Sequence, residues 1–82
     1  MSNTFRTALG ATLREERKSQ GRRMQDVANK GFVSLGYLSE IETGKKEVSS
    51  TILNQLSLAL YYELPLLLRD VADKLEQLEG AK

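Results

Sequence analysis

The chain has 82 residues, of which 40% are hydrophobic and 28% charged, and its formal net charge is +1. This length supports one domain with one modest core, and the composition is typical of a folded chain. The lack of cysteine excludes disulfides and thiolate chemistry, and the lack of histidine removes the commonest general base and metal ligand. We therefore expect no enzyme activity, no metal and no other cofactor.

No apolar run is long enough to cross a bilayer, and the polar start M-S-N-T-F-R-T lacks the apolar core of a signal peptide. These features predict a soluble cytoplasmic protein with no membrane partner. The charge is unevenly distributed, because residues 1–50 carry nine Lys/Arg and six Asp/Glu, whereas residues 51–82 carry three and five. The N-terminal part is thus basic and the C-terminal part mildly acidic.

The first predicted helix covers about residues 5–19 and has apolar side chains at helical spacing: Phe5, Ala8, Leu9 and Leu13. Asn3 or Thr4 is the expected N-cap, and Gly21 the expected stop. Continuing the apolar stripe by four residues from Leu13 places Arg17 on the inward face. Because an unpaired buried charge is costly, Arg17 requires a partner inside the fold.

A second helix is predicted over about residues 24–30, with Met24, Val27 and Ala28 facing inward. Its start is poorly capped, since Arg23 stands where Ser, Thr or Asp serves best. Gly31 is expected to end it, and Phe32 and Val33 to pack inside. Two short helices joined by about three residues that include a glycine form the helix-turn-helix pattern.

The third helix is predicted over about residues 34–43, capped by Ser34 and ended by a left-handed Gly44. Leu38 and Ile41 share its inward face. The opposite face is small and has no long cation, so it fits a groove: Leu35, Gly36, Ser39 and Glu40.

Glu42 lies four residues beyond Leu38 and therefore also on the inward edge of the third helix. We predict a structural ion pair between Arg17 and Glu42 that locks the first helix to the third. The alternative is that both are solvated surface charges.

A fourth helix is predicted from a Ser49 cap to about Leu60, and a fifth from about Pro65 to Glu79, with Gly80 as its stop. The fifth helix carries an apolar seam with heptad spacing: Leu64, Leu68, Val71, Leu75 and Leu78. We expect this seam to pair with the same helix of a second subunit. The alternative is that it folds back on its own core.

Three segments together resemble the phage-repressor-like helix-turn-helix family (XRE, Cro/CI type) over roughly residues 9–68: R-K-S-Q-G-R-R-M-Q-D-V-A, V-S-L-G-Y-L-S-E-I-E-T-G-K-K-E and I-L-N-Q-L-S-L-A-L. Within that family, V-S-L-G-Y-L-S-E-I-E, with K-E-V-S-S and L-L-R-D-V-A-D, is similar to actinobacterial regulators of Clp protease genes. The resemblance implies a compact, lambda-repressor-like fold of five helices. It also implies a homodimer that binds double-stranded DNA at a roughly palindromic operator, with the third helix in the major groove.

The resemblance assigns a base-facing role to the start and outer face of the third helix: Ser34, Leu35, Gly36, Tyr37, Ser39 and Glu40. Phosphate contacts are expected from cations and from the ends of the two motif helices, although any one cation could simply be solvated: Arg14, Arg17, Lys18, Arg22, Arg23, Met24, Gln25, Thr43, Lys45 and Lys46. Leu35 and Gly36 cannot form the bidentate hydrogen bonds that Gln, Asn or Arg form with purine edges. Contact with thymine methyl groups, close backbone approach and DNA shape must then contribute to base reading.

The chain departs from the family pattern at three positions. Arg23 replaces the usual Thr or Ser cap, Phe32 the usual turn glycine, and Tyr61 a glycine after the fourth helix.

We thus predict a DNA-binding domain over residues 5–63 and a dimerisation helix over residues 64–79. The predicted function is a dimeric transcriptional regulator of Clp protease genes that is associated with the nucleoid when bound and has no small-molecule effector. The alternative is a protein-interaction module, antitoxin-like or adaptor, that uses the C-terminal seam.

Overall fold

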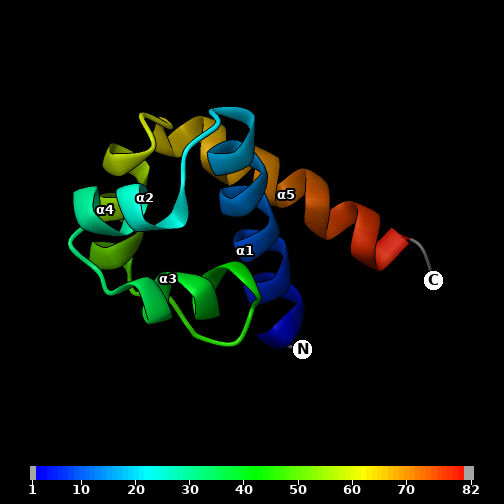
Figure 1. The fold of residues 1–82 in the computed structure, drawn as a ribbon. Helices are drawn as coiled ribbons and strands as arrows, with labels where there is room; N and C mark the ends of the chain where they lie inside the picture. The colour runs from blue at the N-terminus through cyan, green and yellow to red at the C-terminus, as the bar shows by residue number, and fades with distance from the viewer. Residues whose placement is uncertain (1, 81–82) are drawn as a thin grey trace.

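The computed structural model describes residues 2–80, with side chains from residue 4 onward. Within this range it contains five helices and no strand: α1 (Ser2–Ser19), α2 (Met24–Lys30), α3 (Leu35–Glu42), α4 (Ser50–Ala59) and α5 (Leu64–Gly80). The predicted five-helix all-α fold is therefore confirmed. Helices α1 to α4 surround a common core, and α5 runs along α1 before its far end leaves the body of the domain (Figure 1).

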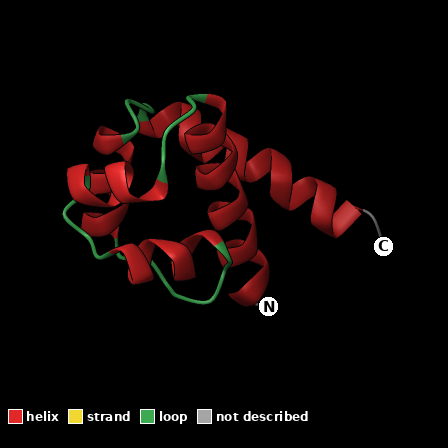
Figure 2. Cartoon of the chain, viewed as in Figure 1, coloured by secondary structure: helices red, strands yellow, loops and turns green. Residues whose placement is uncertain are grey.

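The core takes apolar side chains from every helix, all almost completely buried: Leu9, Leu13, Val27, Leu38, Ile41, Leu56, Leu60, Leu67 and Val71. Helix α1 packs against both α3 and α5, and α2 packs against both α3 and α4. The connections between these helices are short loops (Figure 2). No helix within residues 2–80 combines the length and apolar character that a membrane span requires.

Helices α1 to α4 all end in the same kind of turn, in which one residue adopts a left-handed conformation. After α3, the Gly44 N–H donates to Ile41 O at 3.1 Å and the Lys45 N–H donates to Glu40 O at 2.8 Å. This paired bonding satisfies carbonyls that the helix leaves without partners. The left-handed residues are Gly21 (φ 68°), Phe32 (φ 60°), Gly44 (φ 78°) and Tyr61 (φ 51°). The predicted stops at Gly21 and Gly44 are thus confirmed.

The turn after α2 differs from the prediction. Gly31 has a φ of −88° and remains right-handed, so the residue that reverses the chain is Phe32. The Phe32 side chain is 82% exposed and does not pack inside as expected. A residue in this left-handed position points its side chain away from the helix, whereas the following residue, Val33, turns back onto the core. Gly31 serves a different purpose, because a Cβ there would lie 3.0 Å from Leu56 Cδ2 on α4.

The start of α1 also differs from the prediction. The helix begins at Ser2, so positions 3 and 4 lie inside its first turn instead of capping it. Phe5 is exposed rather than part of the inward stripe. At the other end of the chain, α5 begins at Leu64 with Pro65 in its first turn, as expected, but Gly80 is still helical.

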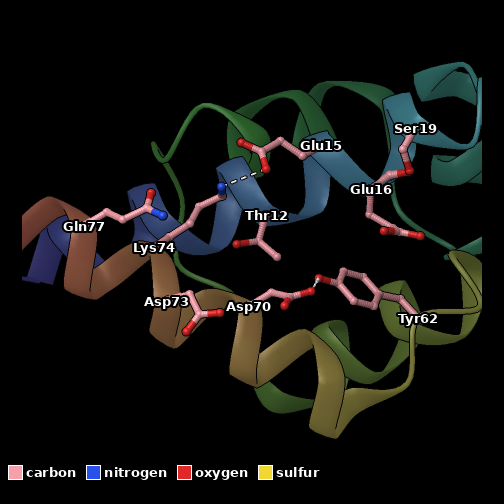
Figure 3. Close-up of a pocket in the computed structure, with 9 residues that line it drawn as sticks. All are labelled: Thr12, Glu15, Glu16, Ser19, Tyr62, Asp70, Asp73, Lys74 and Gln77. Atoms are coloured by element: carbon pink, nitrogen blue, oxygen red, sulfur yellow. Dashed lines mark hydrogen bonds and ion pairs between the residues drawn. The ribbon is translucent and has the colours of Figure 1, made fainter.

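Helix α5 is fixed to the domain from its start to about Leu75. Leu67, which the predicted seam omits, is fully buried together with Val71. Lys74 Nζ forms an ion pair with Glu15 on α1 at 2.7 Å, and the Tyr62 hydroxyl donates to Asp70 (Figure 3). Within the predicted seam, Leu64 and Leu75 are half-buried, whereas Leu68 and Leu78 are 44% and 45% exposed. Part of the seam therefore packs on the core of the same subunit, whereas Leu68 and Leu78 face solvent.

Candidate nucleic-acid interface

Helices α2 and α3 form the predicted helix-turn-helix, and a side-chain cap fixes the start of α3. Ser34 Oγ accepts a hydrogen bond from the Tyr37 N–H at 3.0 Å, as expected for an N-cap. The start of α2 has no such bond, since Arg23 makes no side-chain cap. Leu38 and Ile41 bury the inner edge of α3 in the core. The second helix of the motif is thus held firmly from one side.

The predicted ion pair between Arg17 and Glu42 is present and buried. Arg17 Nε donates to Glu42 Oε2 at 2.8 Å, and Arg17 Nη2 donates to Glu42 Oε1 at 3.0 Å. The remaining Nη1 donates to the Arg22 carbonyl at 2.9 Å. The hydrogen bond with Glu42 raises the pKa of Arg17 above its ordinary value, so the guanidinium stays charged. The bidentate bond fixes the end of α3 against α1.

Gly10 is a positioning residue that the sequence reasoning missed. A Cβ at position 10 would lie 2.2 Å from Ile41 O and 2.8 Å from Glu42 O. Only glycine therefore lets α1 pass this close to the last carbonyls of α3. A glycine in the middle of an otherwise strong helix pattern was the available signal, because glycine weakens a helix and usually has a packing reason to be there.

The outer edge of α3 is exposed and has a low profile at its N-terminal end. Leu35 and Gly36 are both exposed, and a Cβ at position 36 would meet no atom within 4 Å. Ser39 and Glu40 follow on the same side and are partly buried. A partner surface can therefore approach the backbone of α3 closely at Gly36.

Four of the other predicted contact residues also make contacts within the protein. The Tyr37 hydroxyl donates to Glu47 O at 3.2 Å, which ties α3 to the loop before α4. Thr43 Oγ1 donates to Ser39 O at 3.0 Å and caps the end of α3. Gln25, on the first turn of α2, is exposed and bonds to Asn29 Oδ1, while Met24 packs partly on the core.

The predicted phosphate-binding cations fall into two groups. Four of them project into solvent: Arg14, Lys18, Lys45 and Lys46. Arg23 is also exposed, and its Nε lies 3.6 Å from Asp26 Oδ2. Arg17 is instead buried against Glu42, and Arg22 Nη1 donates to Ala59 O at 2.6 Å, which caps α4. The side chains of Arg17 and Arg22 therefore contribute mainly to the stability of the fold.

A cleft of about 370 Å³ between α1 and α5 has the opposite charge character. Four carboxylates line it, together with Lys74: Glu15, Glu16, Asp70 and Asp73 (Figure 3). Such a surface repels phosphate. The cleft therefore marks a side of the molecule that does not suit a nucleic-acid backbone.

Residues 13–67 match the helix-turn-helix family that includes the repressor-type (XRE) regulators. The chain is also 42% identical over 79 residues to the transcriptional regulator ClgR of Mycobacterium tuberculosis, strains CDC 1551 and H37Rv. That alignment covers 96% of this chain and 70% of the relative. The chain belongs to the helix-turn-helix family of transcriptional regulators.

Solved structures support the same assignment. The crystal structure of the clp gene regulator ClgR from Corynebacterium glutamicum superposes with a TM-score of 0.87 at 40% sequence identity, covering 94% of this chain and 81% of that one. A second crystal structure of the same regulator gives a TM-score of 0.83 at 41% identity, covering 87% and 91%. The resemblance to repressor-type and ClgR-like regulators is therefore confirmed, and the protein is a DNA-binding transcriptional regulator.

Proposed function

We propose that the protein binds a roughly palindromic operator as a homodimer, with α3 of each subunit in a major groove. The observation that carries this proposal is the asymmetry of α3. Its inner edge is buried and locked by the bidentate bond between Arg17 and Glu42, whereas a Cβ at Gly36 on its outer edge would meet only open space. A major groove admits one α-helix of this kind.

Base reading by α3 then depends on shape more than on bidentate hydrogen bonds. Leu35 can contact a thymine methyl group, and Gly36 lets the helix backbone approach the base edges. Glu40 can accept a hydrogen bond from cytosine N4 or from a bridging water. Ser34, Tyr37 and Ser39 lie beside these residues.

Dimerisation is assigned to α5, residues 64–79. Leu68 and Leu78 are large apolar side chains that remain partly exposed in the single subunit, and the far end of the helix has no neighbour within the described residues. Pairing these helices would remove that apolar surface from water. The two α3 helices would then have to lie about 34 Å apart to enter successive major grooves.

Affinity should come largely from phosphate neutralisation by the exposed cations that flank the motif, with Thr43, Gln25 and the start of α2 near the backbone. Each neutralised phosphate steepens the slope of log K against log salt by about 0.9. Binding by a dimer should therefore weaken sharply as salt increases.

The ClgR of C. glutamicum is described as a clp gene regulator. By similarity, we assign control of Clp-type protease genes to this protein, acting on the nucleoid in the cytoplasm. The proposal includes no catalytic activity and no small-molecule effector.

Selection of bound duplexes from a random DNA pool tests the proposal. We expect two inverted half-sites whose centres are separated by one helical turn or a multiple of it. Single half-sites, or no enrichment, would overturn the dimeric arrangement. Light scattering on the pure protein distinguishes a homodimeric regulator from the adaptor alternative. An adaptor would be monomeric until it bound a different chain.

A further inference from the structure

Three large apolar side chains project into solvent at the C-terminal ends of α2 and α4. Phe32 is 82% exposed, Leu58 76% and Tyr61 73%. We call these three residues the aromatic patch. The two helix ends are in contact, because a Cβ at Gly31 would lie 3.6 Å from Ala59 Cβ, and Lys30 Nζ donates to the Tyr61 hydroxyl at 3.0 Å. DNA binding by α3 assigns no role to this patch.

The two aromatic residues occupy backbone positions that favour glycine. Phe32 has a φ of 60° and Tyr61 a φ of 51°, whereas the equivalent turns after α1 and α3 use Gly21 and Gly44. A bulky residue with positive φ is strained and is seldom found outside turns or functional sites. Neither side chain recovers this cost by burial. Both aromatic residues therefore destabilise the isolated domain relative to glycine at the same positions.

Two cations surround the Tyr61 ring. Arg22 Cζ lies 5.6 Å from the ring centroid, and Lys30 Nζ lies 5.5 Å from it. Arg22 is anchored by the Ala59 carbonyl and Lys30 by the Tyr61 hydroxyl. An apolar surface with positioned cations at its edge is complementary to an apolar segment that also carries carboxylates.

The turn that carries Tyr61 lies at the opposite end of the domain from α3 (Figure 1). A molecule that binds the Tyr61 side of the patch would therefore leave the outer edge of α3 free. This arrangement suits a regulator that contacts DNA and a second macromolecule together.

We propose that the aromatic patch, with Arg22 and Lys30, docks a segment of a partner protein in which carboxylates flank large apolar side chains. Aromatic side chains and arginine are enriched at the centres of protein interfaces. Single-stranded nucleic acid also stacks on aromatic rings, but it requires a groove of cations that tracks its backbone. Here Leu58 is aliphatic, and Arg22 and Lys30 both lie at the one Tyr61 ring instead of along a groove, so the patch favours a protein partner.

Random peptides displayed on phage test this proposal when they are selected on the wild-type protein and counter-selected on Phe32→Gly/Tyr61→Gly. Glycine suits both left-handed positions, so this variant should melt at or above the wild-type temperature. The recovered peptides should be rich in Asp and Glu beside large apolar residues. They should bind the double variant and Lys30→Glu at least tenfold more weakly, but Leu66→Gln, which alters an exposed leucine on α5, as tightly as wild type.

Failure to recover such peptides, or equal binding to the double variant, would overturn the proposal. So would tight binding of a labelled single-stranded oligonucleotide that depends on Phe32 and Tyr61. Binding of duplex operator by the same variants should be unchanged, because α3 is intact. Loss of operator binding on patch substitution would place the patch in the DNA interface and overturn it as well. If the double variant melts early, Lys30→Glu alone still decides the outcome.

Discussion

Helices α3 and α5 are both half-buried, but they offer very different free surfaces. The inner edge of α3 is locked by a buried ion pair, and its outer edge at Gly36 has no side chain at all. Helix α5 is locked by Leu67, Val71 and the ion pair between Lys74 and Glu15, and its free surface includes the exposed side chains of Leu68 and Leu78. The small outer face of α3 can enter a groove without desolvating a large apolar area. The exposed leucines of α5 are instead stabilised most when a second copy of the helix covers them.

Breaking the ion pair between Arg17 and Glu42, which holds α3, should have the largest effect on stability. Glu42→Leu leaves the Arg17 guanidinium buried without its bidentate partner, so we expect a loss of about 3–5 kcal/mol in the free energy of unfolding. Arg17→Met/Glu42→Leu should recover most of it, because no buried charge remains. Urea denaturation measures both variants. A loss below about 1 kcal/mol for Glu42→Leu would mean that the pair behaves as a solvated one.

The free surface of α5 is tested by placing charge on it. Leu68→Glu/Leu78→Glu should raise the dissociation constant of the dimer by about 100-fold or more, since four leucines per dimer lose their burial. Leu66→Glu, a substitution of an exposed leucine outside the seam, is the matched control and should leave the dimer intact. Analytical ultracentrifugation measures both. Equal dissociation constants would move the dimer interface away from the predicted seam.

A substitution at Gly10, where α1 passes close to α3, should destabilise the domain by a smaller amount. Gly10→Ala introduces a Cβ against the Ile41 carbonyl and should cost about 1–3 kcal/mol by overpacking. Gly36→Ala, which adds the same methyl group to α3 in open space, should instead stabilise the domain by up to about 1 kcal/mol through helix propensity. Thermal unfolding of the pair distinguishes the two. Equal melting temperatures would contradict the packing at Gly10.

The hydrogen bond from Tyr62 to Asp70 should show the smallest effect at neutral pH, because it changes stability with pH only under alkaline conditions. Burial, and then the hydrogen bond to Asp70, raise the pKa of Tyr62, so its stabilising effect is complete below about pH 10 and is lost as the pH rises further. The free energy of unfolding should fall by up to about 1.4 kcal/mol per pH unit from this one proton. Tyr62→Phe should remove that part of the slope.

Tyrosinate absorbance provides a second readout of the same assignment. Lys30 lowers the pKa of Tyr61, whose exposed phenol should therefore ionise before that of Tyr62. Tyr61→Phe should remove the early part of the titration, whereas Tyr62→Phe should remove the late part. If Tyr62 titrated first, its burial against Asp70 would be wrong.

Local sequence chemistry predicted most of the fold. Ser34 and Ser49 are side-chain caps in the structure, Gly21 and Gly44 are left-handed stops, and the four-residue continuation from Leu13 to Arg17 led to the buried ion pair. Each of these inferences depends on spacing within one helix or on the chemistry of one turn. Such features are largely independent of how distant elements pack.

Apart from the helix limits at Ser2 and Gly80, the failures involve packing between elements that are distant in sequence. Gly31 was taken as the turn residue because glycine favours that conformation, but contact with Leu56 on α4 explains it instead. Leu67 was omitted from the apolar stripe of α5 because heptad spacing favoured Leu64 and Leu68. The role of Gly10 could not be derived without knowing that α1 crosses the end of α3. The base-facing and phosphate-contacting assignments remain predictions.

The most direct test of the central claim, that α3 enters the major groove by its outer edge, is a mobility-shift comparison of Gly36→Glu and Gly36→Ala on the selected operator. Both side chains project into open space, so both variants should fold as wild type. Glutamate at position 36 would place a negative charge in the groove, and we expect its binding to fall by at least about 100-fold, while Gly36→Ala loses far less. Operator binding by Gly36→Glu at wild-type affinity would contradict this account.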